Sequence, residues 1–296
     1  MHEENTNTCV SQETDNSRRK KRKVGKLDIL DTLDVGFGLF RSRYKEFFTV
    51  GALLYLPLNL IGALLSYNLL ISPETPLFIV TLVTSIIVAS AYLINYGAQI
   101  HIAAYEYLGE RDRATVKESF KAILRRIFPL SLAGVLKGLG SFIGLLLLIV
   151  PGIWFAVSTI LIEPVLVFEG KGPIASIRRS MKLSKGNKLR LMGLGLLLGI
   201  IVWVLNTLLQ FIMQLFKALW LSWNAIPILP RVMVGEVIGA LPSMLVSPLA
   251  AVVLVVAYFK LRDIVEGFDL ERAVDALNDH ATESSEIVDT SFKSEG

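Results

Sequence analysis

The stretch LMGLGLLLGIIVWVLNTLLQFIMQLF, residues 191–216, contains no charged side chain. As a helix rising ~1.5 Å per residue, it is long enough to cross the ~30 Å hydrocarbon layer of a membrane. Five further apolar blocks occur in the chain, at 47–71, 76–104, 130–150, 153–168 and 232–259. With a hydrophobic fraction of 53%, these six blocks predict an integral membrane protein.

Two of the six blocks are unusual in length. The block at 153–168 is short for a span, and the block at 232–259 is long and contains Pro242 and Pro248. The long block leaves two alternatives open, a single kinked helix or a re-entrant piece followed by a span. We expect Pro151 and Gly152 where the chain reverses between two spans, because proline ends helices and glycine permits sharp turns.

The distribution of basic residues predicts the orientation. Of the 30 Lys and Arg residues, 27 fall before the first block, between the second and third, between the fourth and fifth, or after the sixth. Since Lys and Arg accumulate on the cytoplasmic side, six crossings with both termini in the cytoplasm are expected. The polybasic run RRKKRKVGK (18–26) carries no apolar signal-peptide region, so the N-terminus is expected to remain cytoplasmic and the protein to reside in the cell membrane.

Each outward crossing is preceded by a segment with an amphipathic helical pattern. In the first segment the expected apolar face is formed by Leu30, Leu33, Phe37, Phe40, Tyr44 and Phe47. In the second it is formed by Val116, Phe120, Ile123, Leu124 and Ile127, which follow a Thr115/Glu118 capping box. The third segment starts at Pro173 and has its apolar face at Ile174, Ile177 and Met181, with Leu183 on the opposite side. The predicted fold is therefore all-α, a polytopic transmembrane helix bundle of about six spans with three amphipathic cytoplasmic surface helices.

Three regions are expected along the chain. Residues 1–26 form a polybasic cytoplasmic tail, residues 27–275 a membrane domain of three helix-hairpin units, and residues 276–296 an acidic tail. Both tails are predicted to be disordered, because they contain few apolar residues.

Two stretches carry a resemblance to a known family. PGIW…EPVLVFEGKGPIASIRRSMKLSKGNK (151–188) and AYFKLRDIVEGFDLERAV (257–274) resemble the membrane domain of glycerophosphoryl diester phosphodiesterases and its stand-alone relatives. The matched positions are Pro164, Glu169, Gly170, Arg179, Ser180, Leu183, Gly186, Tyr258, Leu261, Arg262, Glu266, Gly267, Asp269 and Leu270, with Ser176 where alanine is usual. The resemblance covers roughly residues 27–275 and implies the membrane module without the soluble catalytic barrel found in some family members.

No catalytic, cofactor or metal site is expected. His2, His101 and His280 lack the spacing of a metal site, and Cys9 is the single cysteine. We therefore expect no enzymatic activity.

Polar side chains inside the blocks form the candidate site. They lie at helical spacing in the first block (Asn59), the second (Asn95 and Gln99) and the fifth (Asn206 and Gln210), so these residues must face protein or water. Interhelical hydrogen bonds are the favoured interpretation and a solute path is the alternative. Glycine pairs such as Gly140 and Gly144 indicate close helix packing first and dimerisation second.

Five charged positions complete the candidate site. Lys137 and Glu163 lie at nearly equal distances from Pro151, which predicts an ion pair between adjacent helices, with snorkelling to the interface or a coupling site as alternatives. Glu169 is predicted to clamp the third surface helix through Arg262, with Arg179 as the second choice; solvated headgroup-level charges are the competing interpretation.

These features favour a non-enzymatic membrane scaffold or adaptor. The expected partners are the lipid bilayer, anionic lipids at the basic cytoplasmic face, and a protein partner or second copy of the chain; nucleic acid is not expected. The alternative is a transporter of small solutes or lipids that uses the polar faces. An intramembrane enzyme is the least supported class, because no nucleophile and base lie at matched depth.

Overall fold

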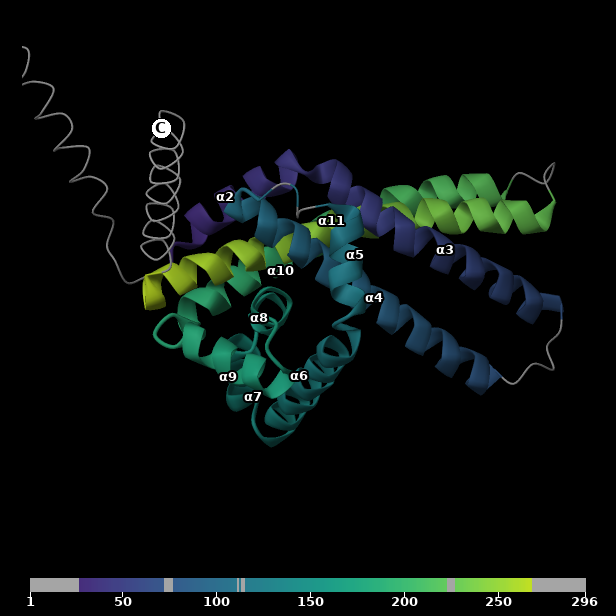
Figure 1. Ribbon diagram of the computed structural model, residues 1–296. Coiled ribbons are helices and arrows are strands. Elements are labelled where there is room, and N and C mark those ends of the chain that lie inside the picture. The colour runs from purple at the N-terminus through teal and green to yellow at the C-terminus, as the bar shows by residue number, and fades with distance from the viewer. Residues whose placement is uncertain (1–26, 72–76, 111, 113–114, 223–226, 268–296) are drawn as a thin grey trace, which may run out of the picture. The chain divides into compact units, whose positions relative to one another are not determined.

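The structure is a computed structural model that describes residues 27–71, 77–110, 112, 115–222 and 227–267 (Figure 1). The chain divides into two compact units, Asp28–Lys260 and the joined chain ends Met1–Leu27 and Leu261–Gly296. The predicted tails at 1–26 and 276–296 lie outside the described residues.

Helices account for nearly all of the described residues, and no strand occurs among them. In chain order they are α2 (Ile29–Ser42), α3 (Tyr44–Ile71), α4 (Leu77–Leu108), α5 (Val116–Leu124), α6 (Ile127–Leu147), α7 (Ile149–Ser158), α8 (Ile162–Glu169), α9 (Pro173–Ser184), α10 (Lys188–Leu221) and α11 (Ile228–Glu266).

Five segments are long and apolar enough to cross a membrane: Thr84–Leu108 in α4, α6, Ile149–Glu169 over α7 and α8, α10, and α11. The protein is therefore a helical membrane protein. The first predicted block lies in the helix α3, in which the side chains beyond Leu64 fall outside the described residues.

The reversal between α6 and α7 differs from the prediction. It occurs at Leu148, whose backbone is extended, and Pro151 lies in the first turn of α7. A proline is tolerated there because the first backbone N–H groups of a helix have no intrahelical acceptor. Gly152 serves the packing instead: a Cβ at this position would lie 2.5 Å from the backbone nitrogen of Leu145, so the absence of a side chain lets α6 and α7 touch.

The predicted fourth span is not one continuous helix. Three residues, Thr159–Leu161, form a turn between α7 and α8. The break follows Ser158, whose hydroxyl donates to the carbonyl of Trp154 one turn earlier at 2.6 Å. Such a break leaves backbone groups without helical partners, and these require partners from elsewhere in the protein.

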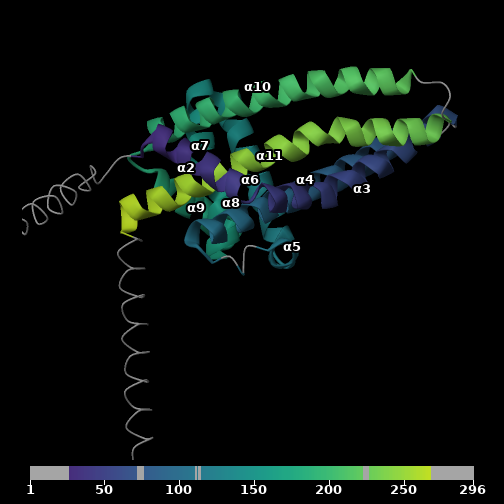
Figure 2. The same cartoon turned by 90° about the horizontal axis from the view of Figure 1, so that it is seen from above.

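α11 is a continuous helix that passes through Pro242 and Pro248, which excludes the alternative of a re-entrant piece. Its middle is buried by several other helices. A Cβ on Gly36 of α2 would meet Val253 at 2.7 Å, and one on Gly51 of α3 would meet Met244 at 3.5 Å. α11 is therefore the central helix of the unit (Figure 2).

α10 contrasts with α11, since most of its surface is exposed. Its buried residues, Leu191, Leu194 and Leu198, all lie near its N-terminal end. Its other end is tied to α11 by the ion pair between Lys217 and Glu236 at 2.8 Å. An apolar helix with so much exposed surface is suited to contact with lipid.

Helices form at the three segments with predicted amphipathic patterns, as α2, α5 and α9, but their buried faces differ from the sequence pattern. α2 buries Thr32, Leu33 and Gly36, whereas Leu30 is 73% exposed. α5 begins after Thr115, whose hydroxyl accepts a hydrogen bond from the Glu118 backbone N–H as the capping box predicted, and it ends at Leu124.

α9 begins at Pro173 as predicted. It buries Leu183 and three serines one turn apart, Ser176, Ser180 and Ser184. The predicted apolar face is the outer one, because Ile174 is 60% exposed and Met181 is 40% exposed. The prediction thus identified the apolar face of α9 but not the face that packs on the protein.

Candidate functional site

The end of α8 is the point where the largest number of predicted residues converge. α8 terminates at Gly170, which adopts a left-handed conformation (φ 67°) that favours glycine. The preceding residue, Glu169, has a side chain that is only 9% exposed. A buried carboxylate needs hydrogen-bond donors around it, and three side chains provide them.

Arg179 of α9 is the principal partner of Glu169. Its Nε atom donates to both carboxylate oxygens, at 2.9 and 3.1 Å. The Tyr258 hydroxyl of α11 donates to Oε1 at 2.8 Å, and Lys171 forms an ion pair with Oε2 at 2.5 Å. The structure therefore joins Glu169 to the second of its two predicted partners. Glu169, Lys171, Arg179 and Tyr258 are called the Glu169 cluster below.

Arg262, the first predicted partner, lies in the chain-end unit. Its Nε atom is 3.6 Å from Glu266 in the last turn of α11. The two residues are four positions apart on one helix, a spacing that brings side chains together.

A second arginine holds the same end of α8. Arg126, which lies between α5 and α6, donates from Nη1 to the carbonyl oxygens of Leu166 (3.3 Å) and Val167. The Leu166 carbonyl also accepts from the backbone N–H of Gly170, so the guanidinium adds a second donor there and supplies one to Val167. A positive charge at a helix C-terminus also interacts favourably with the helix dipole. Arg126 was not identified from the sequence, because its acceptors are backbone atoms some 40 positions away.

Aromatic rings surround the Glu169 cluster. Phe168 packs against Phe259 with ring centres 5.2 Å apart and against Tyr258 at 6.2 Å. Tyr105 of α4 lies 6.1 Å from Phe168, and Tyr107 stacks on Phe259 at 4.8 Å. Aromatic contacts of this kind exclude water from the carboxylate and its partners, so α4, α8, α9 and α11 meet in one packed region.

The break between α7 and α8 is filled by the serine face of α9. The Ser180 hydroxyl donates to the carbonyl of Ser158 at 2.9 Å and accepts a hydrogen bond from the backbone N–H of Leu161 at 3.3 Å. Ser184 also donates to the Ser158 carbonyl, at 3.4 Å. The backbone groups released by the break thus find partners on α9, which fixes this helix against the span.

The predicted ion pair inside the apolar blocks is present. Lys137 of α6 lies 2.7 Å from Oε1 of Glu163, in the first turn of α8. The other carboxylate oxygen of Glu163 is buried and has no hydrogen-bond partner in the described structure. The start of a helix favours negative charge, which adds to the stabilisation supplied by Lys137.

The predicted polar face of α4 meets α3 and α11. The Asn95 amide donates to the Tyr55 hydroxyl at 3.4 Å, and the Gln99 amide donates to the Ser247 hydroxyl at 3.1 Å. Asn59 instead donates to the carbonyl of Tyr55 on its own helix, at 2.7 Å. The amide oxygens of Asn95 and Gln99 are buried without a partner among the described residues.

Asn206 and Gln210 are not brought into this group. Both lie on α10 and are partly exposed.

Of the glycine pairs, Gly140 and Gly144 lie against α7, since added Cβ atoms would meet Phe155 and Gly152 at 2.5 and 2.8 Å. For this pair, close packing within the chain is the correct interpretation.

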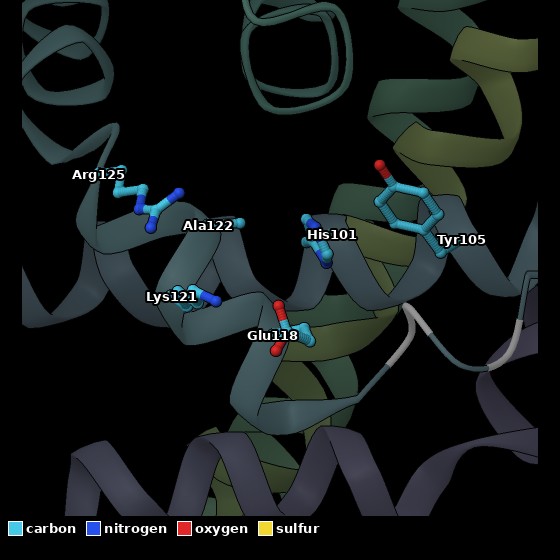
Figure 3. A pocket seen from close by; sticks show the side chains of 6 residues that line it. All are labelled: His101, Tyr105, Glu118, Lys121, Ala122 and Arg125. Carbon is cyan, nitrogen blue, oxygen red and sulfur yellow. The ribbon is translucent and has the colours of Figure 1, made fainter.

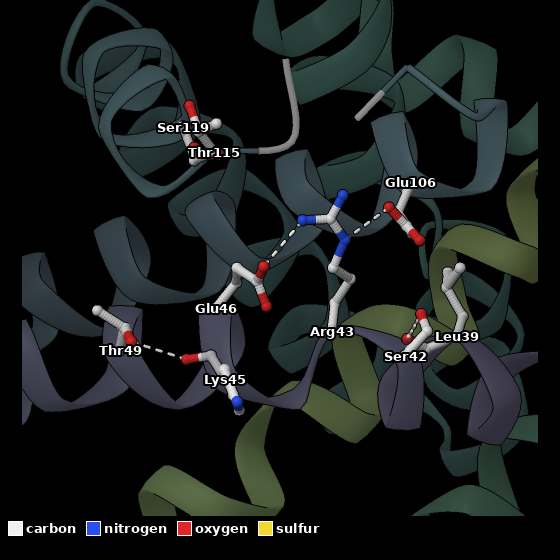
Figure 4. A network of polar contacts seen from close by, with 9 residues as sticks. All are labelled: Leu39, Ser42, Arg43, Lys45, Glu46, Thr49, Glu106, Thr115 and Ser119. Carbon is white, nitrogen blue, oxygen red and sulfur yellow. Dashed lines mark hydrogen bonds and ion pairs between the residues drawn. The ribbon is translucent and has the colours of Figure 1, made fainter. Parts of the chain in front are cut away.

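A further polar network links the start of α3 to the end of α4 (Figure 4). Arg43 donates from Nε to Glu106 at 2.8 Å and from Nη1 to Glu46 at 2.8 Å. The hydrogen bond that Arg43 donates to Glu46 is the largest cause that raises the pKa of Arg43 above its ordinary value. The side chain of Glu106 is 6% exposed, so this pair fixes the corner between α2 and α3 against α4.

Within the described residues, no group of three His, Cys, Asp or Glu side chains is placed to hold a metal ion. The Glu169 cluster, the serine contacts of α9 and the pair of Lys137 with Glu163 each join different helices. The direct effect of these contacts is to hold the ends of the helices in place.

Residues 119–261, just under half of the chain, match the model of a family described as a domain of unknown function (DUF7847). The matched segment runs from α5 into α11, so it contains the Glu169 cluster, the break between α7 and α8 and the ion pair of Lys137 with Glu163. No curated protein and no solved structure matched the chain. The chain is thus similar to this family over the segment in which its helix ends are fixed.

Proposed function

We propose that the protein is a non-enzymatic scaffold of the cell membrane that binds anionic lipids through a basic cytoplasmic face. In this proposal α3 is a sixth span, both termini lie in the cytoplasm, and α2, α5 and α9 lie at the cytoplasmic surface. The positive-inside distribution of Lys and Arg supports the orientation, and the 28 residues of α3 supply the length of a span.

The observation that carries the proposal is the way α9 is held. Its serine face fills the break in the fourth span and Arg179 is bound by Glu169, so the opposite face is fixed toward the exterior. That outer face carries three exposed cations, Arg178, Lys182 and Lys185, beside the exposed Ile174 and Met181. Exposed cations beside exposed apolar side chains are the pattern of a helix in an anionic membrane interface.

α5 presents a similar surface. Its exposed cations are Lys117, Lys121 and Arg125, and the exposed apolar residues Leu124 and Phe128 lie beside them. A rigid array of cations binds anionic headgroups with less loss of conformational entropy than a flexible tail does. The fixed positions of these cations therefore support specific binding of anionic lipid by this surface.

The resemblance to the membrane domain of glycerophosphoryl diester phosphodiesterases agrees with a structural module. Four of the residues that carry the resemblance, Glu169, Arg179, Ser180 and Tyr258, take part in the contacts that fix α8, α9 and α11. We expect the purified chain to release no glycerol phosphate from glycerophosphodiesters. Metal-dependent release by rigorously purified protein would contradict the non-enzymatic part of the proposal.

The lipid part is tested by the triple variant Arg178→Gln, Lys182→Gln and Lys185→Gln. Wild type and variant are reconstituted in nanodiscs of mixed phosphatidylcholine and phosphatidylglycerol, and the lipids retained on repurification are quantified. We expect wild type to enrich phosphatidylglycerol and the variant to lose most of that enrichment, since each surface cation contributes ~1 kcal/mol of attraction to anionic lipid.

The matched control exchanges the same positions while keeping the charge, as Arg178→Lys, Lys182→Arg and Lys185→Arg. It should retain the enrichment, because interfacial attraction depends mainly on charge. Equal enrichment in all three proteins, or none in wild type, would refute the proposed role.

The alternative function, transport of a small solute or lipid, is favoured by one observation. Asn95 and Gln99 each place a buried amide oxygen without a partner among the described residues, between α3, α4 and α11. Unpartnered buried oxygens are costly, and polar intramembrane groups mark solute paths in many transporters. A flux screen in proteoliposomes with solute and lipid panels tests it, and flux lost on Gln99→Leu but retained on Gln210→Leu would favour transport over the scaffold.

A further inference from the structure

A pocket of about 280 Å³ opens where α5 meets the end of α4. It is lined by His101, Tyr105, Glu118, Lys121, Ala122 and Arg125. Figure 3 shows Lys121 and Arg125 along one side and His101 and Tyr105 along the other, with Glu118 between them. Glu118, Lys121 and Arg125 take no part in the contacts described for the Glu169 cluster.

The two cations of the pocket are available for an anion. Lys121 and Arg125 are one helical turn apart, and both are exposed. Within the described residues, neither they nor Glu118 takes part in an ion pair. Two unpaired cations at the rim of one pocket favour a phosphate group, whose oxygens accept from guanidinium and ammonium donors together.

The remaining lining adds hydrogen-bond acceptors. The Ser119 hydroxyl donates to the carbonyl of Thr115 at 2.8 Å, so its oxygen accepts from Nδ1–H of His101 at 3.0 Å. In the neutral imidazole of His101, this places the proton on Nδ1 and leaves Nε2 as an acceptor. With the Glu118 carboxylate, the pocket therefore offers acceptors beside its cations, which suit a ligand with a hydroxyl or primary ammonium group next to its phosphate.

The level of the pocket indicates where such a ligand comes from. The apolar segment of α4 ends at Leu108, within one turn of Tyr105, and α5 lies beyond this end. In a membrane this is the level of the headgroups. This placement rests on the proposed function, whereas the recognition of phosphate rests on the lining residues alone.

We propose that the pocket formed by His101, Tyr105, Glu118, Lys121 and Arg125 binds a phosphate ester that carries a hydroxyl or primary ammonium group. The phospholipid headgroup and a soluble phosphate are the two sources of this chemistry. Lys121 and Arg125 hold the phosphate oxygens, and Glu118 and Nε2 of His101 accept from the neighbouring donor group.

The test uses the full chain in neutral detergent micelles. The protein is titrated into short-chain phospholipids, and binding is followed by the ³¹P NMR signal of the phospholipid. The probes are dihexanoyl phosphatidylglycerol, dihexanoyl phosphatidylcholine, whose headgroup has no donor, and inorganic phosphate. We expect phosphatidylglycerol to saturate one site and phosphatidylcholine to bind at least about tenfold more weakly, a difference of ~1.4 kcal/mol. Tight binding of phosphatidylglycerol but not inorganic phosphate assigns a lipid source, and equal binding assigns a soluble one.

The double variant Lys121→Gln and Arg125→Gln should weaken binding at least about tenfold, and it should fold because both side chains are exposed. The matched control is Lys117→Gln, which removes an exposed cation of the same helix outside the pocket lining. An equal loss in this control, or no saturable binding by wild type, would overturn the inference. A saturable site without phosphatidylglycerol enrichment in nanodiscs would reject the scaffold proposal but keep this one.

Discussion

The Glu169→Gln variant is expected to destabilise the folded protein by ~2–3 kcal/mol. The carboxylate is 9% exposed and accepts from Arg179 at 2.9 and 3.1 Å and from Tyr258 at 2.8 Å. Hydrogen bonds to charged groups contribute ~1.5–3 kcal/mol each, and a glutamine keeps the shape and one of the two acceptor oxygens. Its amide nitrogen, however, would face donors, so at least one of the bonds is lost.

A double-mutant cycle separates the contact with Arg179 from general disruption. Glu169→Gln, Arg179→Gln and the pair are unfolded by SDS titration from one detergent, and the coupling energy is taken from the four free energies of unfolding. We expect ~1–2 kcal/mol of coupling, since both side chains are largely buried.

The control cycle pairs Glu169→Gln with Lys171→Gln on the same carboxylate. The Lys171 side chain is 43% exposed, so its coupling to Glu169 should stay below ~0.5 kcal/mol. If the Arg179 cycle gave no more coupling than the Lys171 cycle, the reasoning that the buried contact fixes α9 would be wrong.

Three further substitutions follow from the packing. Gly152→Ala should lower the free energy of unfolding by ~1–3 kcal/mol, because its Cβ would meet backbone at 2.5 Å. The control Gly138→Ala, whose Cβ would have nothing within 4 Å, should be neutral or stabilising. Equal changes in stability for the two variants would count against the close approach of α6 and α7. Ser180→Ala should cost ~1–3 kcal/mol by leaving backbone groups at the helix break without partners, and an unchanged melting temperature would contradict this role. Lys137→Met should destabilise strongly by leaving Glu163 unpaired, and adding Glu163→Met should restore most of the stability; a double variant no better than the single one would argue against the pair.

The positions of five long apolar segments were predictable because hydropathy identifies the segments that can enter a membrane. The pair of Lys137 and Glu163 was predictable because helix rise fixes the depth of both residues. The break after Ser158 was not, because the segment around it is apolar and is interrupted by a contact with Ser180, 22 positions later. Local pattern carries no information about such a partner.

Two other features show the same limit. The sequence marks Pro151 as a turn residue, yet the chain turns at Leu148, since a proline fits the first turn of α7 equally well. The serine face of α9 resembles a solvent face, but its hydroxyl groups satisfy a broken helix that hydrophobic periodicity does not reveal.

The most direct test of the account is the side of the membrane on which the ends of the helices lie. With Cys9 replaced by Ala, single cysteines at the exposed positions Asp112, Lys185 and Ser222 are labelled in intact cells with a membrane-impermeant maleimide, with lysed cells as the reference. The account predicts that Ser222→Cys is labelled from outside and that Asp112→Cys and Lys185→Cys are labelled only after lysis. External labelling of either Asp112→Cys or Lys185→Cys would contradict a cytoplasmic face formed by α5 and α9.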